Sequence, residues 1–261
     1  MSNNYFESDG RCVTSFAKSK VYTKSRKYFS VEEERIKKIP LIENYQNIKN
    51  FLCSDIDLSF EQFKDSIDKI KNDLSSNVDT KNILNSVGIP FILPKTKIDD
   101  VGTNIKDIYL PALEKSFKNA YPEYNFTNHC KDKLKNEIGI WEGARYQNLV
   151  ERLKKENIVG LLFLNLNEFS FPASIETINN LPENFILAGG YEVISSLIGC
   201  PSTLRRDVGY PPLLWFSSLK NLNDDNLCYH IEPYGYNLTF NKRAHLNDAA
   251  EYWWNSLIVI A

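Results

Sequence analysis

Two residues that could carry chemistry stand two positions apart near the end of the chain, Cys228 and His230. Side chains two apart in a β-strand point to the same face, so this pair could present a thiol and an imidazole together. Nucleophilic catalysis by such a pair depends on its placement in space, and no local signature of a cysteine enzyme surrounds it. We take Cys228 and His230 as the candidate catalytic residues, beside the plainer interpretation that both pack in the interior.

The same two residues, combined with His129 and Cys130, offer the ligand types of a zinc site. The two pairs lie far apart in the sequence, adjacent ligands such as His129 and Cys130 are awkward, and the usual spacing of structural zinc sites is missing. The chain also lacks the glycine-rich motifs that cradle nucleotides. The sequence therefore predicts neither a metal nor a cofactor.

A candidate anion site is formed by two glycines and two arginines. Gly189 and Gly190 stand where the chain could enter a helix, and Arg205 and Arg206 follow that helix. Glycine lets backbone N–H groups approach a ligand, a helix N-terminus favours negative charge, and arginine adds paired donors for phosphate or carboxylate. The alternative is a turn followed by an arginine pair that binds nearby acidic residues.

Three short segments occur in a familiar order: LFLNLNEFS at residues 162–170, LRR at 204–206 and PLLWFS at 212–217. Over about residues 60–217 the chain resembles an uncharacterised bacterial protein family, and it departs from that family in its N-terminal segment, in the loop at 223–225 and in its ending. The family has no established activity, so the resemblance implies a bacterial cytosolic domain and no mechanism. It favours Arg205, Arg206 and Trp215 as ligand-binding residues.

Composition bounds the class of protein. The 261 residues are 43% hydrophobic and 13% aromatic, which is enough for a real core and argues against disorder. The net charge of −2 argues against a dedicated nucleic-acid-binding protein, and no apolar run is long enough to cross a membrane. Five widely spaced cysteines and the absence of an apolar leader in the first 30 residues indicate a cytoplasmic location.

The elements that must position these residues follow from hydrophobic periodicity. Residues 1–30 lack it and are rich in lysine and arginine, which predicts a flexible basic arm. We expect residues 31–261 to form a single main domain, α/β or α+β, with a mixed sheet and flanking helices. The part up to about residue 88 reads as helical, and the sheet follows it.

Individual strands are predicted from short apolar runs. Residues 158–164 read as a central strand buried on both faces, and 89–93 as an edge strand because it contains Pro90. Residues 226–232 and 236–241 read as a hairpin turned at 233–235. A helix is expected over 245–254, followed by a last buried strand at 257–261.

With no catalytic signature and an aromatic C-terminal third, the leading hypothesis is a non-catalytic binding or interaction protein, with a protein partner or a second copy of the chain. The alternative is an enzyme or ligand-binding domain that holds an anionic small molecule at Gly189, Gly190, Arg205 and Arg206.

Overall fold

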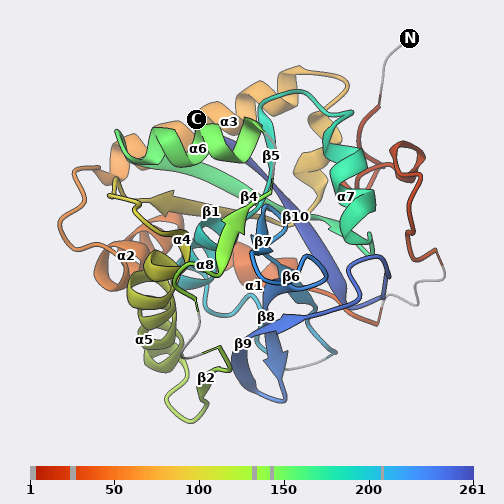
Figure 1. Cartoon of the computed structure of the whole chain (residues 1–261). Coiled ribbons are helices and arrows are strands. Elements are labelled where there is room, and N and C mark those ends of the chain that lie inside the picture. Colours follow the sequence, from red (N-terminus) through yellow and green to blue (C-terminus); the bar gives the residue numbers. More distant parts are fainter. Residues whose placement is uncertain (1–3, 24–27, 131–133, 142–143, 207–208) are drawn as a thin grey trace.

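A computed structural model of the chain describes residues 4–23, 28–130, 134–141, 144–206 and 209–261 (Figure 1). A mixed sheet crosses the molecule in the strand order β1-β4-β10-β6-β8-β9-β2, and β5 also pairs with β10. A second, small sheet contains β3 and β7. The predicted fold class, a mixed sheet with flanking helices, is confirmed. No helix in the described ranges has the length and apolar character needed to cross a membrane.

The strands are β1 (Gly88–Leu93), β2 (Phe126–Asn128), β3 (Ile138–Ile140), β4 (Ile158–Asn167), β5 (Phe185–Leu187), β6 (Leu213–Trp215), β7 (Leu219–Asn221), β8 (Cys228–Tyr234), β9 (Asn237–Arg243) and β10 (Trp253–Ile260). The helices are α1 (Glu33–Lys37), α2 (Leu41–Phe51), α3 (Phe60–Ser76), α4 (Val101–Asn104), α5 (Leu110–Ala120), α6 (Ala144–Leu153), α7 (Phe171–Ile178) and α8 (Gly190–Gly199). Short 3₁₀ turns lie at Thr14–Phe16 (η1) and Lys81–Asn85 (η2), and a π-helical turn, η3 (Ile105–Tyr109), joins α4 to α5.

The predicted central strand is β4, which pairs antiparallel with β1 on one side and with β10 on the other. Its residues are buried on both faces up to the last one, which is why its sequence is a continuous apolar run. The predicted edge strand is β1, whose Pro90 lacks the N–H that a further neighbour would need. Helix α3 packs on β4 and α8 packs on β1.

Helix α8 lies in the interior and is buried along its whole length, in agreement with its apolar sequence. Its Ser195 covers the open edge of β1, because the Ser195 hydroxyl accepts from the N–H of Ile92 and donates to the Ile92 carbonyl. Both backbone groups of Ile92 would otherwise be buried without a partner, so the serine satisfies the sheet edge inside the protein.

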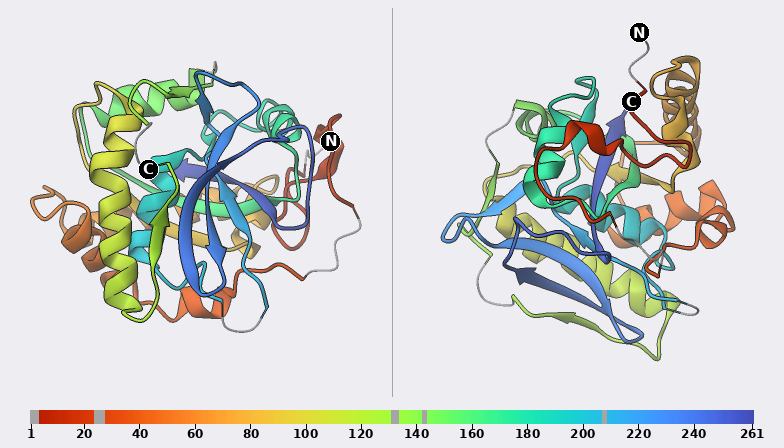
Figure 2. Two further views of the ribbon diagram at one scale, coloured as in Figure 1. Left: turned by 60° about the horizontal axis from the view of Figure 1, so that its bottom comes forward. Right: turned by 90° about the vertical axis from the view of Figure 1, so that its right-hand side faces the viewer.

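The described part of the segment predicted to be a flexible basic arm is docked on the domain in the structure (Figure 2). Phe6 and Cys12 are completely buried, and the N–H of Cys12 donates to the carbonyl of Asn165 in β4. Farther along, the carboxylate of Glu176 on α7 accepts from the backbone N–H groups of Lys18 and Ser19. The contacts with β4 and α7 therefore tie the described part of this segment to the domain.

The predicted hairpin is confirmed as β8 and β9, but its turn lies at 235–236 and not at 233–235, because β8 extends to Tyr234 and Gly235 takes a φ of +62°. The helix expected over residues 245–254 is wrong. Residue His245 has a φ of +70°, the chain turns between 245 and 252, and Trp253 already begins β10. Trp253 and Trp254 are both buried because β10 lies inside the sheet with neighbours on each side, so their adjacency is no sign of a helix.

Candidate functional site

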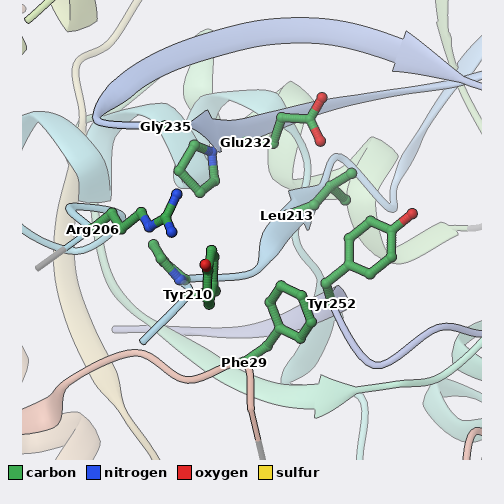
Figure 3. Close-up of a pocket in the computed structure, with 9 residues that line it drawn as sticks. Phe29, Arg206, Tyr210, Leu213, Glu232, Gly235 and Tyr252 are labelled. Carbon is green, nitrogen blue, oxygen red and sulfur yellow. The ribbon is translucent and has the colours of Figure 1, made fainter. Parts of the chain in front are cut away.

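A small pocket opens where the β8–β9 hairpin meets the loop before β6 (Figure 3). Its volume is about 90 Å³, room for several water molecules or for the charged head of a larger ligand that extends through the open mouth. Its walls come from segments far apart in the sequence: Phe29, Arg206, Tyr210, Pro211, Leu213, Glu232, Pro233, Gly235 and Tyr252.

Aromatic rings form the wall on one side of the pocket. Phe29, from the docked N-terminal segment, forms a parallel bridge with Tyr210, and its ring centroid lies 5.4 Å from that of Tyr252. The Tyr210 ring also stacks on Tyr28 at 4.7 Å. Three distant segments are thereby fixed against one another by ring contacts, which gives the pocket a rigid apolar wall.

The acidic group of the pocket is Glu232 on β8, and it already has a cationic partner. Nη2 of Arg243, on β9, lies 3.2 Å from Oε2 of Glu232, and Nη1 of Arg243 donates to the Tyr252 hydroxyl at 3.0 Å. On the other side, Nε2 of His230 lies 3.3 Å from Oε1 of Glu232, although the ring is not aligned for a hydrogen bond. Arg243 thus connects two walls of the pocket, Glu232 and Tyr252.

Burial and charge set the ionisation of this group of residues. Burial lowers the pKa of His230, and the contact with Glu232 only partly opposes this. Burial would raise the pKa of Glu232, but the neighbouring His230 and the positive charge of Arg243 outweigh it and lower that pKa. We therefore assign a neutral imidazole and an ionised carboxylate, with Arg243 balancing the negative charge of Glu232.

Arg206 lies across the pocket from Glu232 (Figure 3). Its guanidinium carbon lies 3.9 Å from the centroid of the Tyr210 ring, so the ring positions the cation. None of the ion pairs that the described residues form includes Arg206. Since Arg243 already balances Glu232, the positive charge that this pocket offers to a ligand is that of Arg206.

The candidate catalytic residues lie on β8, the strand that also carries Glu232 of this pocket. Cys228 and His230 are both completely buried and, as β8 requires, are two residues apart on one face. The Cys228 sulfur contacts the carbonyls of Phe216 and Leu219, and burial raises the pKa of its thiol. A neutral buried thiol is a poor nucleophile, so the geometry gives no support to thiol catalysis.

Trp215 on β6 belongs to the same buried layer. Its ring meets the His230 ring edge-on at 5.2 Å and the Trp253 ring at 5.7 Å. With 2% of its surface exposed, Trp215 supports the strand that carries the pocket and does not line the pocket itself.

The structure does not bring the two glycines together with the two arginines. Gly189 and Gly190 lie at the N-terminal end of α8, whereas Arg205 and Arg206 follow its C-terminal end. The N–H of Gly189 donates to the carboxylate of Glu192 at 2.8 Å, so the protein's own acid occupies this helix start. Arg205 stacks on Tyr121 at 4.7 Å and does not line the pocket, which leaves Arg206 as the predicted site residue found there.

The described residues contain no group of three or more histidine, cysteine, aspartate and glutamate side chains that could hold a metal ion. His129 and Cys130 follow β2, and the N–H of His129 donates to the carbonyl of Phe240 on β9.

Comparisons with protein-family models, with curated proteins and with solved structures gave no match to this chain. The function must therefore be argued from the site itself. Sequence reasoning missed Phe29, Tyr210, Glu232 and Tyr252 as pocket residues. One signal was available for Glu232, because it continues the alternation of Cys228 and His230 along one strand face.

Proposed function

We propose that the protein is a non-catalytic binding protein that holds a small anionic molecule in the pocket between Arg206, Tyr210 and Glu232. The observation that carries the proposal is the position of Arg206, stacked on Tyr210 at 3.9 Å and outside the ion pairs of the described residues. A guanidinium held over a ring presents a preorganised fork of donors to a carboxylate or phosphate.

The ligand that suits the pocket has an anionic head and a flat apolar body. Phe29, Tyr210 and Tyr252 offer ring surface beside the guanidinium, and Leu213 adds an aliphatic contact. An aromatic carboxylate could pair with Arg206 while its ring contacts these side chains. Benzoate is a simple probe of this chemistry, with inorganic phosphate and benzyl alcohol as tests of the head group and of the ring alone.

Arg206→Ala is expected to weaken benzoate binding by roughly 10- to 100-fold, because a hydrogen-bonded ionic contact is lost. Isothermal titration calorimetry measures the change. Arg206→Lys should retain part of the affinity, since it keeps the charge without the fork. Arg205→Ala is the matched control, because the neighbouring guanidinium stacks on Tyr121 outside the pocket. Equal losses in Arg205→Ala and Arg206→Ala, or binding of benzyl alcohol as tight as that of benzoate, would contradict the proposal.

A second candidate function is self-association through the tip of the β8–β9 hairpin. Tyr234 and Tyr236 are 75% and 52% exposed there, and Tyr236 stacks on Tyr124 at 5.4 Å. Beside them β2 forms the edge of the sheet, and a second copy of the chain could offer the same strand and the same rings in a twofold arrangement. Exposed tyrosines are common anchors of such interfaces.

Tyr234→Ser combined with Tyr236→Ser is expected to shift the protein toward the monomer if this interface forms. Native mass spectrometry over a range of concentrations measures the shift. Leu222→Ser is a suitable control because Leu222 is also exposed, at 51%, but follows β7 and not the hairpin tip. A wild-type protein that stays monomeric at the highest concentration would exclude this second function.

A further inference from the structure

A larger pocket lies away from the Arg206 site, between α6, α7 and β5. Its volume is about 280 Å³, close to the lower end of the range for small-molecule sites. Its apolar walls are Ile175 and Ile178 from α7, Ile186 from β5 and Trp141 after β3. A cavity of this size and lining takes a small molecule with an apolar body.

Ser217 lines this pocket, and its hydroxyl has its proton directed into the protein. It donates to Oδ1 of Asn255 at 2.7 Å, and the orientation of that amide is fixed because Nδ2 of Asn255 donates to the carbonyl of Phe169 at 2.8 Å. A hydroxyl has one donor and two acceptor lone pairs. What remains on Ser217 for a ligand is therefore acceptor capacity.

Two further hydroxyls repeat this arrangement. Ser218 donates to the carbonyl of Leu187, which can only accept. Tyr146 donates to Oε2 of Glu192 at 3.2 Å, and burial raises the pKa of Tyr146, so the phenol keeps its proton for that bond. The three hydroxyl-bearing residues of the lining thus each donate toward the protein, and each hydroxyl keeps lone pairs.

The pocket contains one charged group of each sign within the described part of the chain. Arg145 is its cation within the described part of the chain, and its guanidinium is used by the carbonyls of Leu181, Pro182 and Phe185 at 2.9–3.1 Å. Glu183, by contrast, is an exposed carboxylate at the rim. The exposed carboxylate can accept from an incoming donor, whereas three of the five guanidinium N–H groups are already used by backbone carbonyls.

We propose that this pocket is a second ligand site that takes a small amine bearing an apolar group. The apolar group lies among Ile175, Ile178 and Trp141, and the amine donates to the oxygens of Ser217, Ser218 and the rim carboxylate of Glu183. The expected ligand is a cation here and an anion in the Arg206 pocket. The two pockets share no lining residue, so the two proposals can be tested independently.

Benzylamine is the probe, with benzyl alcohol and benzoate as the matched neutral and anionic molecules. We expect benzylamine to bind most tightly of the three at this site and to shift the indole N–H signal of Trp141 in a ¹⁵N NMR spectrum, where Trp141→Phe identifies that signal among the four tryptophans. Glu183→Gln and Ser218→Ala should each weaken binding by about tenfold. Glu123→Gln, an exposed acid far along the chain from these elements, should leave it unchanged.

Ser218 is buried, so Ser218→Ala could fail to fold. Glu183 is exposed, so Glu183→Gln should fold normally and still test the proposal. Saturation of the Arg206 pocket with benzoate should not displace benzylamine, which separates this site from the first one. The inference is overturned if benzyl alcohol shifts the Trp141 signal at the same concentrations as benzylamine. It is also overturned if Glu183→Gln binds benzylamine like the wild type, or if benzoate competes with it.

Discussion

The wild-type protein is expected to lose stability as the pH rises from 4.5 to about 7, and replacing Glu192 by glutamine is expected to abolish this loss. The Glu192 carboxyl is completely buried at the start of α8, and this burial raises its pKa to about 7 although the N–H of Gly189 and the hydroxyl of Tyr146 donate to it. The folded state therefore holds the Glu192 proton more tightly than the unfolded state does. The stabilisation is complete below pH 4.5 and is lost as the pH rises through the folded pKa.

The gap between a pKa of 4.5 in the unfolded chain and about 7 in the folded one corresponds to on the order of 3 kcal/mol. Glutamine stays neutral, and its side-chain oxygen can accept the same two hydrogen bonds. At pH 8 we expect Glu192→Gln to be more stable than the wild type by up to about 3 kcal/mol, and at pH 4.5 to differ little.

The measurement is chemical denaturation of both proteins from pH 4.5 to 8, with Glu123→Gln as the control for a surface acid. Burial raises the pKa of the three neighbouring phenols, Tyr109, Tyr146 and Tyr191, so these do not titrate in this range. His230 acts in the opposite direction, because its lowered pKa adds stability as the pH rises. It is present in both proteins, so the difference between them isolates Glu192. Parallel pH profiles for the two proteins would show that Glu192 does not titrate as described.

The elements that could be predicted are those whose pattern has a single physical interpretation. A continuous apolar run of strand length with β-branched residues indicates a central strand, and β4 is one. The capping box at Ser59 and Gln62 marks the start of α3, where both of its hydrogen bonds are present. The hairpin follows from two strand patterns separated by a turn that contains Gly235.

The expected helix over 245–254 failed because residues 245–252 turn, with a φ of +70° at His245, and only the last two residues of the range belong to β10. Trp253 and Trp254 are held in a strand by the neighbours of β10, namely β4, β5 and β6, and no local pattern contains these neighbours.

The same limit applies to the site. The pocket joins Phe29 to Arg206, Glu232 and Tyr252. These residues come from segments far apart in the sequence, and no local sequence pattern predicts that such segments meet. At the start of α8 a local signal did exist. Glu192 stands three residues after Gly189, the spacing at which a carboxylate can reach back to the helix start. That spacing indicates an N-terminus occupied by the protein's own acid.

Phe6→Ala is expected to destabilise the protein strongly, although Phe6 lies in the segment whose sequence predicts a flexible arm. Its side chain is completely buried and its ring centroid lies 5.5 Å from that of Phe185 on β5, while its carbonyl accepts from the Asn82 side chain at 3.2 Å. Truncation of a buried phenylalanine to alanine costs about 3–5 kcal/mol. For a chain of this length, a loss of 3 kcal/mol lowers Tm by roughly 6–12 °C.

Phe6→Ala can lower the stability of the domain only if the N-terminal segment is docked on it. Limited trypsin digestion, which measures docking, should therefore accompany the thermal scan. Arg11, Lys18 and Lys20 are potential cleavage sites in the segment, and docking makes them poor substrates until it opens. Phe6→Ala should speed cleavage at these residues and lower Tm together, while Glu7→Ala, at the exposed neighbouring position, should change neither. Rapid cleavage of the wild-type segment with an unchanged Tm in Phe6→Ala would instead mean that the segment is free in solution. Phe29, which this segment contributes to the Arg206 pocket, would then not be held in place from the N-terminal side.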